Sequence, residues 1–167
     1  MFDRLLLAID DAPASAVATA FAAAVAAHSS ASVHVFHVNE YLVGGRGVTQ
    51  KTTEECREFV TDAVLELRAH GVTVGGSACC GTYREVPARI AAAAVAYQAD
   101  AIILGSQRRR SRLGGLVSPN VRERTIRLSA LPILTAPSPL HVTVRSALRI
   151  DDVLSAYTDS GLTADLT

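Results

Sequence analysis

Short apolar runs alternate with longer helical patterns along most of this chain, and this alternation limits the fold more than any other feature. Five runs have the length and the apolar or β-branched content of strands. These predicted strands span residues 4–10, 32–38, 72–80, 100–105 and 132–136, with helices expected over about 15–28, 52–70, 85–97 and 119–128. Because successive parallel strands need crossover connections, the order predicts a parallel sheet covered by helices on both faces.

The first predicted helix has an amphipathic pattern. Val17, Phe21 and Val25 recur at i, i + 4 and i + 8, which gives one apolar stripe on an alanine-rich segment. Either Asp11 or Ser15 is available to cap its start. We therefore expect this helix to pack one face against the sheet.

Length and composition indicate one globular domain. The chain has 167 residues, of which 49% are hydrophobic and 19% charged. Sixteen basic and sixteen acidic residues cancel, so the overall charge gives no support for nucleic-acid or membrane binding. No apolar run approaches the roughly 20 residues of a membrane span, and Asp3, Asp10 and Asp11 interrupt the start, unlike a secretory signal. We expect a soluble cytoplasmic protein.

The residue types that carry catalysis or bind metals form no recognisable set. Cys56, Cys79 and Cys80 are odd in number, lack metal-ligand spacing, and are interpreted as small core residues. If residues 72–80 form a strand, Cys79 and Cys80 point to opposite faces. The five histidines are scattered, with no Ser-His-Asp arrangement in the sequence. We therefore predict neither a catalytic site nor a metal site.

The expected place for a ligand follows from the predicted topology. In open parallel sheets, ligands bind outside the carboxyl ends of the strands, where the strand order reverses. In this chain those ends are Ile9-Asp10-Asp11, Val38-Asn39 and Gly105-Ser106. The last of them lies near the start of the stretch "LGSQRRRSRLGGLVSPNV". In this stretch a glycine follows the apolar strand, and a cluster of arginines comes shortly after it.

Several segments, in this order, resemble the universal stress protein (UspA) family. They are "LLLAIDDAPAS", "VFHVNE", "GTYREVPARIAAAAVAYQADAIILGS" and "VRERTIRLSALPIL", and the resemblance covers roughly residues 2–137. It implies a doubly wound, open, five-stranded parallel sheet of strand order 3-2-1-4-5, Rossmann-like and similar to the adenine nucleotide alpha hydrolases. It also implies a homodimer formed through the fifth strand. The domain would span 1–137, and the tail 138–167 could include a short amphipathic helix.

One branch of this family binds ATP or AMP, with Mg²⁺ accompanying ATP, through a G-x2-G-x9-G-[ST] loop. The resemblance implies that Asp10 contacts the ribose or adenine and that Val38 lines the adenine pocket. Gly105 matches the first glycine of the loop, and Ser106 follows it. For Asp10 the alternative is a helix-capping or surface carboxylate, and for Val38 it is an ordinary core position.

The rest of the loop departs from the family pattern. Arg108 stands where the second glycine belongs. The third position falls either on Ser118, followed by Pro119 in place of the hydroxyl, or on Pro119, followed by Asn120. A side chain at Arg108 puts a Cβ where backbone and phosphate should touch, and proline has no amide donor. For Asn120 the alternative is capping of the following helix.

The arginine cluster leaves several interpretations open. Arg108, Arg109, Arg110 and Arg112 could bind phosphates through their side chains where backbone amides no longer do so. They could instead bind an acidic partner or form a solvated loop. Nucleic acid is disfavoured because no aromatic residue is interleaved with them.

Three functions remain as hypotheses. The first is a non-enzymatic universal-stress-type regulatory protein with a degenerate nucleotide-binding loop. The alternative is an ATP- or AMP-binding member with slow ATPase activity, for which Asp10 or Asp11 would have to hold the metal. The third is a protein-interaction module that uses the arginine cluster or the tail.

Overall fold

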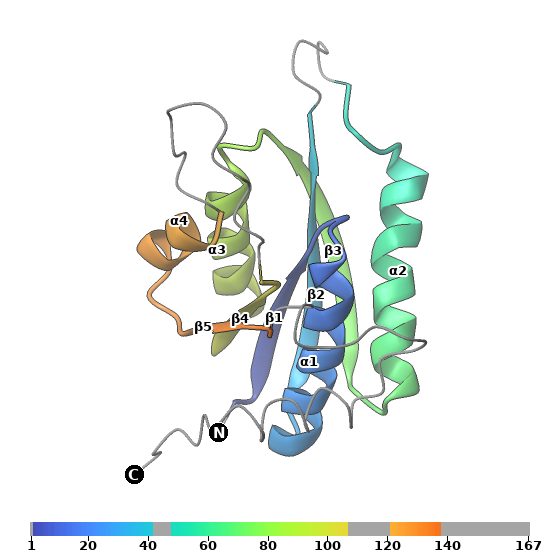
Figure 1. Ribbon diagram of the computed structural model, residues 1–167, viewed down its shortest axis with the longest axis vertical. Coiled ribbons are helices and arrows are strands. Elements are labelled where there is room, and N and C mark those ends of the chain that lie inside the picture. The colour runs from blue at the N-terminus through green and yellow to red at the C-terminus, as the bar shows by residue number, and fades with distance from the viewer. Residues whose placement is uncertain (1, 42–47, 107–120, 138–167) are drawn as a thin grey trace.

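The computed structural model describes residues 2–41, 48–106 and 121–137, and it has the predicted alternation of strands and helices (Figure 1). The elements are β1 (Arg4–Ile9), α1 (Ala14–Ser29), β2 (Ser32–Glu40), α2 (Thr53–Ala69), β3 (Val74–Gly81), α3 (Val86–Tyr97), β4 (Ala101–Leu104), α4 (Val121–Leu128) and β5 (Ile133–Thr135). The expected sites Arg108, Ser118 and Asn120, the other arginines of the cluster, and the tail 138–167 lie outside the described residues.

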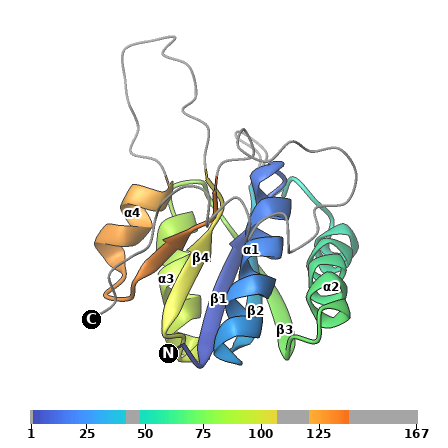
Figure 2. The ribbon, with the colours of Figure 1, turned by 60° about the horizontal axis from the view of Figure 1, so that its bottom comes forward.

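The five strands form one sheet in the order β3-β2-β1-β4-β5, and all four pairings are parallel. This confirms the predicted doubly wound α/β fold. From β1 the chain builds outward through β2 to β3, then returns to the other side of β1 to add β4 and β5 (Figure 2). The strand order therefore reverses between β1 and β4, and β3 and β5 are the edge strands.

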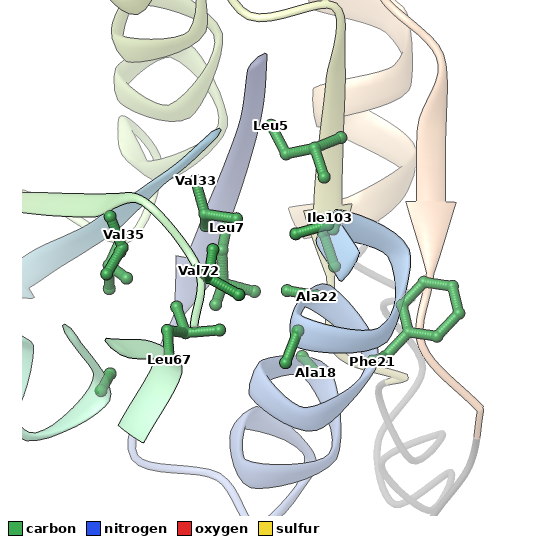
Figure 3. Packing of buried hydrophobic residues seen from close by; sticks show 14 of the residues in the cluster. Leu5, Leu7, Ala18, Phe21, Ala22, Val33, Val35, Leu67, Val72 and Ile103 are labelled. Carbon is green, nitrogen blue, oxygen red and sulfur yellow. The ribbon is translucent and has the colours of Figure 1, made fainter. Parts of the chain in front are cut away.

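Helices cover both faces of the sheet because the central strands are apolar on both sides. Leu5 and Leu7 of β1 point toward the layer formed by α1 and α2, where they pack with residues such as Phe21 and Leu67 (Figure 3). Leu6, between them, points to the opposite layer and packs with residues of α3. The alternation of side chains along a strand thus builds two cores, one on each face.

The connections that lead into α1 and α2 cap these helices in different ways. At α1, neither Asp11 nor Ser15 caps the helix, so that prediction is wrong: the N-cap is Pro13, which makes no side-chain cap bond. Ser15 lies inside the first turn, and its hydroxyl bonds instead to Asp10. At α2, Thr52 is the N-cap and forms a capping box with Glu55.

The cysteines occupy three different environments. Cys56 of α2 is buried, as expected for a small core residue. Cys79 is half-buried against the α3 layer, whereas Cys80 is exposed, so the core interpretation is wrong for Cys80. The reason is the position of β3 at the edge of the sheet, which its own sequence does not reveal.

Among the described helices, none is long and apolar enough to cross a membrane.

Candidate functional site

Three of the expected ligand residues lie side by side at the carboxyl ends of β1, β2 and β4. The register pairs Ile9 with His37 and Ala8 with Leu104. Asp10 therefore lies level with Val38 on one side and one residue beyond the level of Gly105 on the other. This is the reversal point of the strand order, where ligands bind in sheets of this type.

Asp10 is held by bonds within its own loop. Its Oδ1 accepts hydrogen bonds from the Ala12 amide at 3.0 Å and from the Ser15 hydroxyl at 2.8 Å. The backbone amide of Asp10 donates to the same hydroxyl at 2.8 Å. The carboxylate thus fixes the turn from β1 into α1, and its exposed position leaves the side chain open to solvent.

Gly105 is required by the packing between the end of β4 and the start of α1. A Cβ at this position would lie 3.1 Å from the carbonyl oxygen of Ala14 and 3.2 Å from its Cβ. These contacts are tighter than nine in ten real Cβ contacts, so a larger residue would require Ala14 to shift by a few tenths of an ångström. The glycine is therefore explained by this close approach, independently of any phosphate.

The other two described candidates also have local partners. Val38 is buried and belongs to the core under α3, which agrees with the alternative of an ordinary core residue. The hydroxyl of Ser106 donates to the carbonyl of Pro137 at 3.1 Å and so ties the chain after β4 to the chain after β5.

A basic residue that the sequence interpretation missed lies beside this site. The Asn39 side chain binds the backbone of Lys51 twice, donating to its carbonyl at 2.8 Å and accepting from its amide at 3.1 Å. The Lys51 ammonium then pairs with Asp11 at 2.8 Å and lies over the ring of Phe59. Lys51 thus puts a fixed positive charge next to one of the two carboxylates considered for metal binding.

This arrangement disfavours Asp11 as a metal ligand. A carboxylate in an ion pair with an ammonium would have to exchange that partner for the metal. In the part of the chain that the structure describes, no three His, Cys, Asp or Glu side chains are grouped to hold a metal ion. In the described part of the site, Asp10, Asn39, Lys51 and the backbone supply hydrogen-bonding groups and charge.

A doubly wound α/β domain with polar side chains at the reversal of strand order is typical of nucleotide-binding and related regulatory proteins. The model of the universal stress protein family matches residues 1–137. The chain belongs to this family. A search of curated proteins finds no match.

Solved structures of the family have the same fold. A universal stress family protein from Burkholderia pseudomallei is 21% identical, with 81% of this chain and 96% of that chain covered and a TM-score of 0.62. A universal stress protein from Archaeoglobus fulgidus in complex with dAMP is also 21% identical, over 81% and 98% of the two chains, with a TM-score of 0.60. A universal stress protein in complex with cAMP is 18% identical over 80% and 95%, with a TM-score of 0.63. Some structural neighbours therefore bind adenine nucleotides.

Proposed function

We propose that this chain is a non-enzymatic regulatory protein of the universal stress type, with a degenerate nucleotide-binding loop that no longer binds phosphate through its backbone in the usual way. The observation that carries this proposal is the close packing of Gly105 against Ala14, because it gives the first loop glycine a structural reason that needs no phosphate. Such a role agrees with the cytoplasmic location expected from the sequence.

The remaining described site residues support the same interpretation. Asp10 is engaged within its turn, and Val38 is buried under α3. Asp11 is paired with Lys51, which disfavours a metal-dependent reaction. In the sequence, Arg108 stands where a glycine would let the backbone approach phosphate. Pro119 stands where a backbone amide would donate to phosphate, and proline has no such amide.

The second candidate function is binding of ATP or AMP through arginine side chains, with slow ATPase activity. It is favoured by the dAMP and cAMP complexes of structural neighbours and by the position of Asp10 at the reversal point. In this case Arg108 and its neighbours would bind phosphate as charged forks, and Ser118 or Asn120 would contribute polar groups. Mg²⁺ would then accompany ATP.

Isothermal titration calorimetry with ATP, AMP and cyclic AMP, each with and without Mg²⁺, separates the two. The first proposal expects no binding signal from any nucleotide. Micromolar binding that disappears when Arg108, Arg109, Arg110 and Arg112 are replaced by alanine would establish the second. Magnesium-dependent phosphate release that Asp10→Ala abolishes would add the ATPase activity, whereas release that this variant leaves unchanged would exclude Asp10 as the metal ligand.

We further propose a homodimer formed through β5. β5 (Ile133–Thr135) is an edge strand, and its three residues are half-buried in the single chain, which leaves an apolar edge open for pairing. Light scattering should give twice the mass of one chain. Leu134→Lys should convert the dimer to a monomer, and a monomeric mass for the unaltered protein would exclude the dimer.

A further inference from the structure

The opposite edge of the sheet, formed by β3, has backbone groups that point away from the sheet. The ladder with β2 is bounded by two bonds, from the Val33 amide to the Thr73 carbonyl and from the Tyr41 amide to the Gly81 carbonyl. Because bonding alternates along a strand, the odd-numbered residues 73–81 face β2. The amides and carbonyls of Gly76, Ala78 and Cys80 therefore face outward.

This edge has few of the features that normally prevent strand pairing. Arg68 covers its first part, since its guanidinium donates to the outward carbonyl of Val74 at 3.3 Å. Beyond that point, the described chain supplies no hydrogen-bond partner to the outward groups of Gly76, Ala78 and Cys80. Residues 75–81 include no charged residue and no proline, and most of them are exposed. Edge strands are usually protected by such residues, by bulges or by very short length.

A pocket of about 310 Å³ lies along the same edge, between α2 and β3, which lie next to each other (Figure 2). Cys56 and Val60 of α2 line it on one side, and Gly76, Ala78 and Cys80 of β3 line it on the other. Its volume is about ten times the ~30 Å³ share of one liquid water, so it accommodates an apolar side chain.

The charge at this pocket indicates what kind of ligand fits. Arg57 is the one charged side chain among the described residues that line it. Its pair with Glu54 is exposed, with 66% and 65% of the two side chains accessible. Because exposed ion pairs of this kind contribute little, Arg57 can exchange Glu54 for a carboxylate of a ligand at small cost.

We propose that the β3 edge is a docking site for an extended peptide segment of a partner protein, which adds a strand beside β3. The peptide pairs with the outward groups of Gly76, Ala78 and Cys80, as in other strand-addition complexes. One of its branched apolar side chains fills the pocket, and an acidic residue contacts Arg57. This inference does not depend on the nucleotide proposal, because it uses the outward backbone groups of the β3 edge, although Asn39 belongs both to the pocket and to the candidate site.

A second copy of this chain fits the edge less well than such a peptide. Its own β3 would offer only Gly76, Ala78 and Cys80 on the side of the pocket, and these are too small to fill it. A symmetric pairing would also bring Arg57 of each copy toward the other. A foreign strand with a larger apolar residue and a carboxylate satisfies both the volume and the charge.

The test uses the whole chain and a phage-displayed library of random linear heptapeptides. Ala78→Pro removes an outward amide and leaves the ladder to β2 intact, which is the position where an edge strand tolerates proline. Ala78→Ser keeps that amide and is the matched control. We expect one enriched peptide family with alternating apolar residues and an Asp or Glu. Its synthetic representative should bind Ala78→Pro at least tenfold more weakly than Ala78→Ser, and Arg57→Glu should weaken it too.

Two further measurements keep the result decisive. Thermal melting should give similar transitions for Ala78→Pro and Ala78→Ser, which separates loss of binding from loss of folding. Amide exchange by NMR should slow at Gly76, Ala78 and Cys80 when the peptide is added. The proposal is overturned if no peptide family is enriched, or if the peptide binds Ala78→Pro and Ala78→Ser equally. It is also overturned if the added peptide slows amide exchange at other residues instead. Sedimentation that detects a dimer broken by Ala78→Pro would assign the edge to a second copy instead.

Discussion

The Nε2 atom of His34 lies 2.7 Å from the hydroxyl oxygen of Ser77, across the neighbouring strands β2 and β3. The imidazole also contacts the ring of Tyr97, with 4.8 Å between the ring centroids. The Tyr97 hydroxyl in turn donates to Ser32 at 2.9 Å. These contacts partly bury His34, and burial lowers the pKa of its imidazole below the ordinary value of 6.5.

We predict from this pKa shift that acid destabilises the protein through His34. As the pH falls below about 6.5, the unfolded chain binds a proton that the folded chain does not yet bind, so the free energy of unfolding decreases. The decrease ends once the pH has passed below the folded pKa. Urea unfolding of the wild type and of His34→Gln at pH 8, 6 and 5 should give a smaller acid loss for the variant.

The control for this experiment is His28→Gln, at an exposed position of α1. It should keep the acid loss of the wild type, because His34 is still present. Equal pH dependence of the wild type and His34→Gln would show that the acid loss comes from other groups.

Replacement by alanine should lower the stability of the protein at Gly76 of β3 but not at the adjacent Gly75. A Cβ at Gly76 would lie 2.6 Å from a methyl of Val60 and 3.0 Å from a methyl of Val64. Because valine has few rotamers in a helix, these methyls cannot turn away and α2 has to shift. We expect Gly76→Ala to lower the free energy of unfolding by about 1–3 kcal/mol, measured by urea denaturation.

Gly75→Ala is the matched comparison. A Cβ there meets only the Nδ1 of His34 within 4 Å, at 3.9 Å. The substitution also reduces the conformational entropy of the unfolded chain, so we expect it to be neutral or to stabilise by about 0.4–1 kcal/mol. If both variants lose stability equally, contact between Gly76 and α2 is not the cause.

The order of elements and the location of the site could be predicted because both depend on local patterns. A period of two or of 3.6 residues is visible within a single segment, and the carboxyl ends of parallel strands meet at one edge of a sheet. Asp10, Val38 and Gly105 were therefore expected together. Their local partners were not, because the packing of Gly105 on Ala14 joins residues 91 positions apart in the sequence.

Contacts between distant segments account for the other differences. Asn39 binds Lys51, which lies twelve positions further along the sequence, and His34 contacts Ser77, which lies 43 positions further along. Neither pair has a motif spacing that would reveal it. The exposure of Cys80 likewise depends on which strand lies at the edge, and that is a property of the whole sheet.

The capping box at the start of α2 should be a measurable source of stability. The Thr52 hydroxyl accepts from the amide of Glu55 at 3.2 Å, and the Glu55 carboxylate accepts from the amide of Thr52 at 2.7 Å. We expect Thr52→Ala to cost about 1 kcal/mol, because one amide of the first turn loses its partner. Thr53→Ala, one residue on and exposed, should stay within about 0.5 kcal/mol in the same urea titration. Equal losses would place the effect outside the cap.

The last prediction concerns Asp100, which joins the start of β1 to the loop before β4. Its Oδ2 accepts from the backbone amides of Asp3 at 2.6 Å and Arg4 at 2.8 Å. These bonds, that of Asp3 first, lower the pKa of the carboxyl below its ordinary value of 3.8. The stability that they contribute is therefore present above about pH 3.8 and is lost as the pH falls through the folded pKa.

Asp100→Asn keeps the shape of the side chain and removes its charge, so it should lower the melting temperature at pH 7. The difference from the wild type should narrow between pH 4 and pH 2.5, because the unfolded wild type then binds a proton at Asp100 that the folded form, with its lowered pKa, does not yet bind. Asp62→Asn, at an exposed position of α2, is the control and should change the melting temperature little at any of these pH values. A difference for Asp100→Asn that persists unchanged at pH 2.5 would mean that the charge of Asp100 does not stabilise the fold, and that the variant acts through altered packing of the loop.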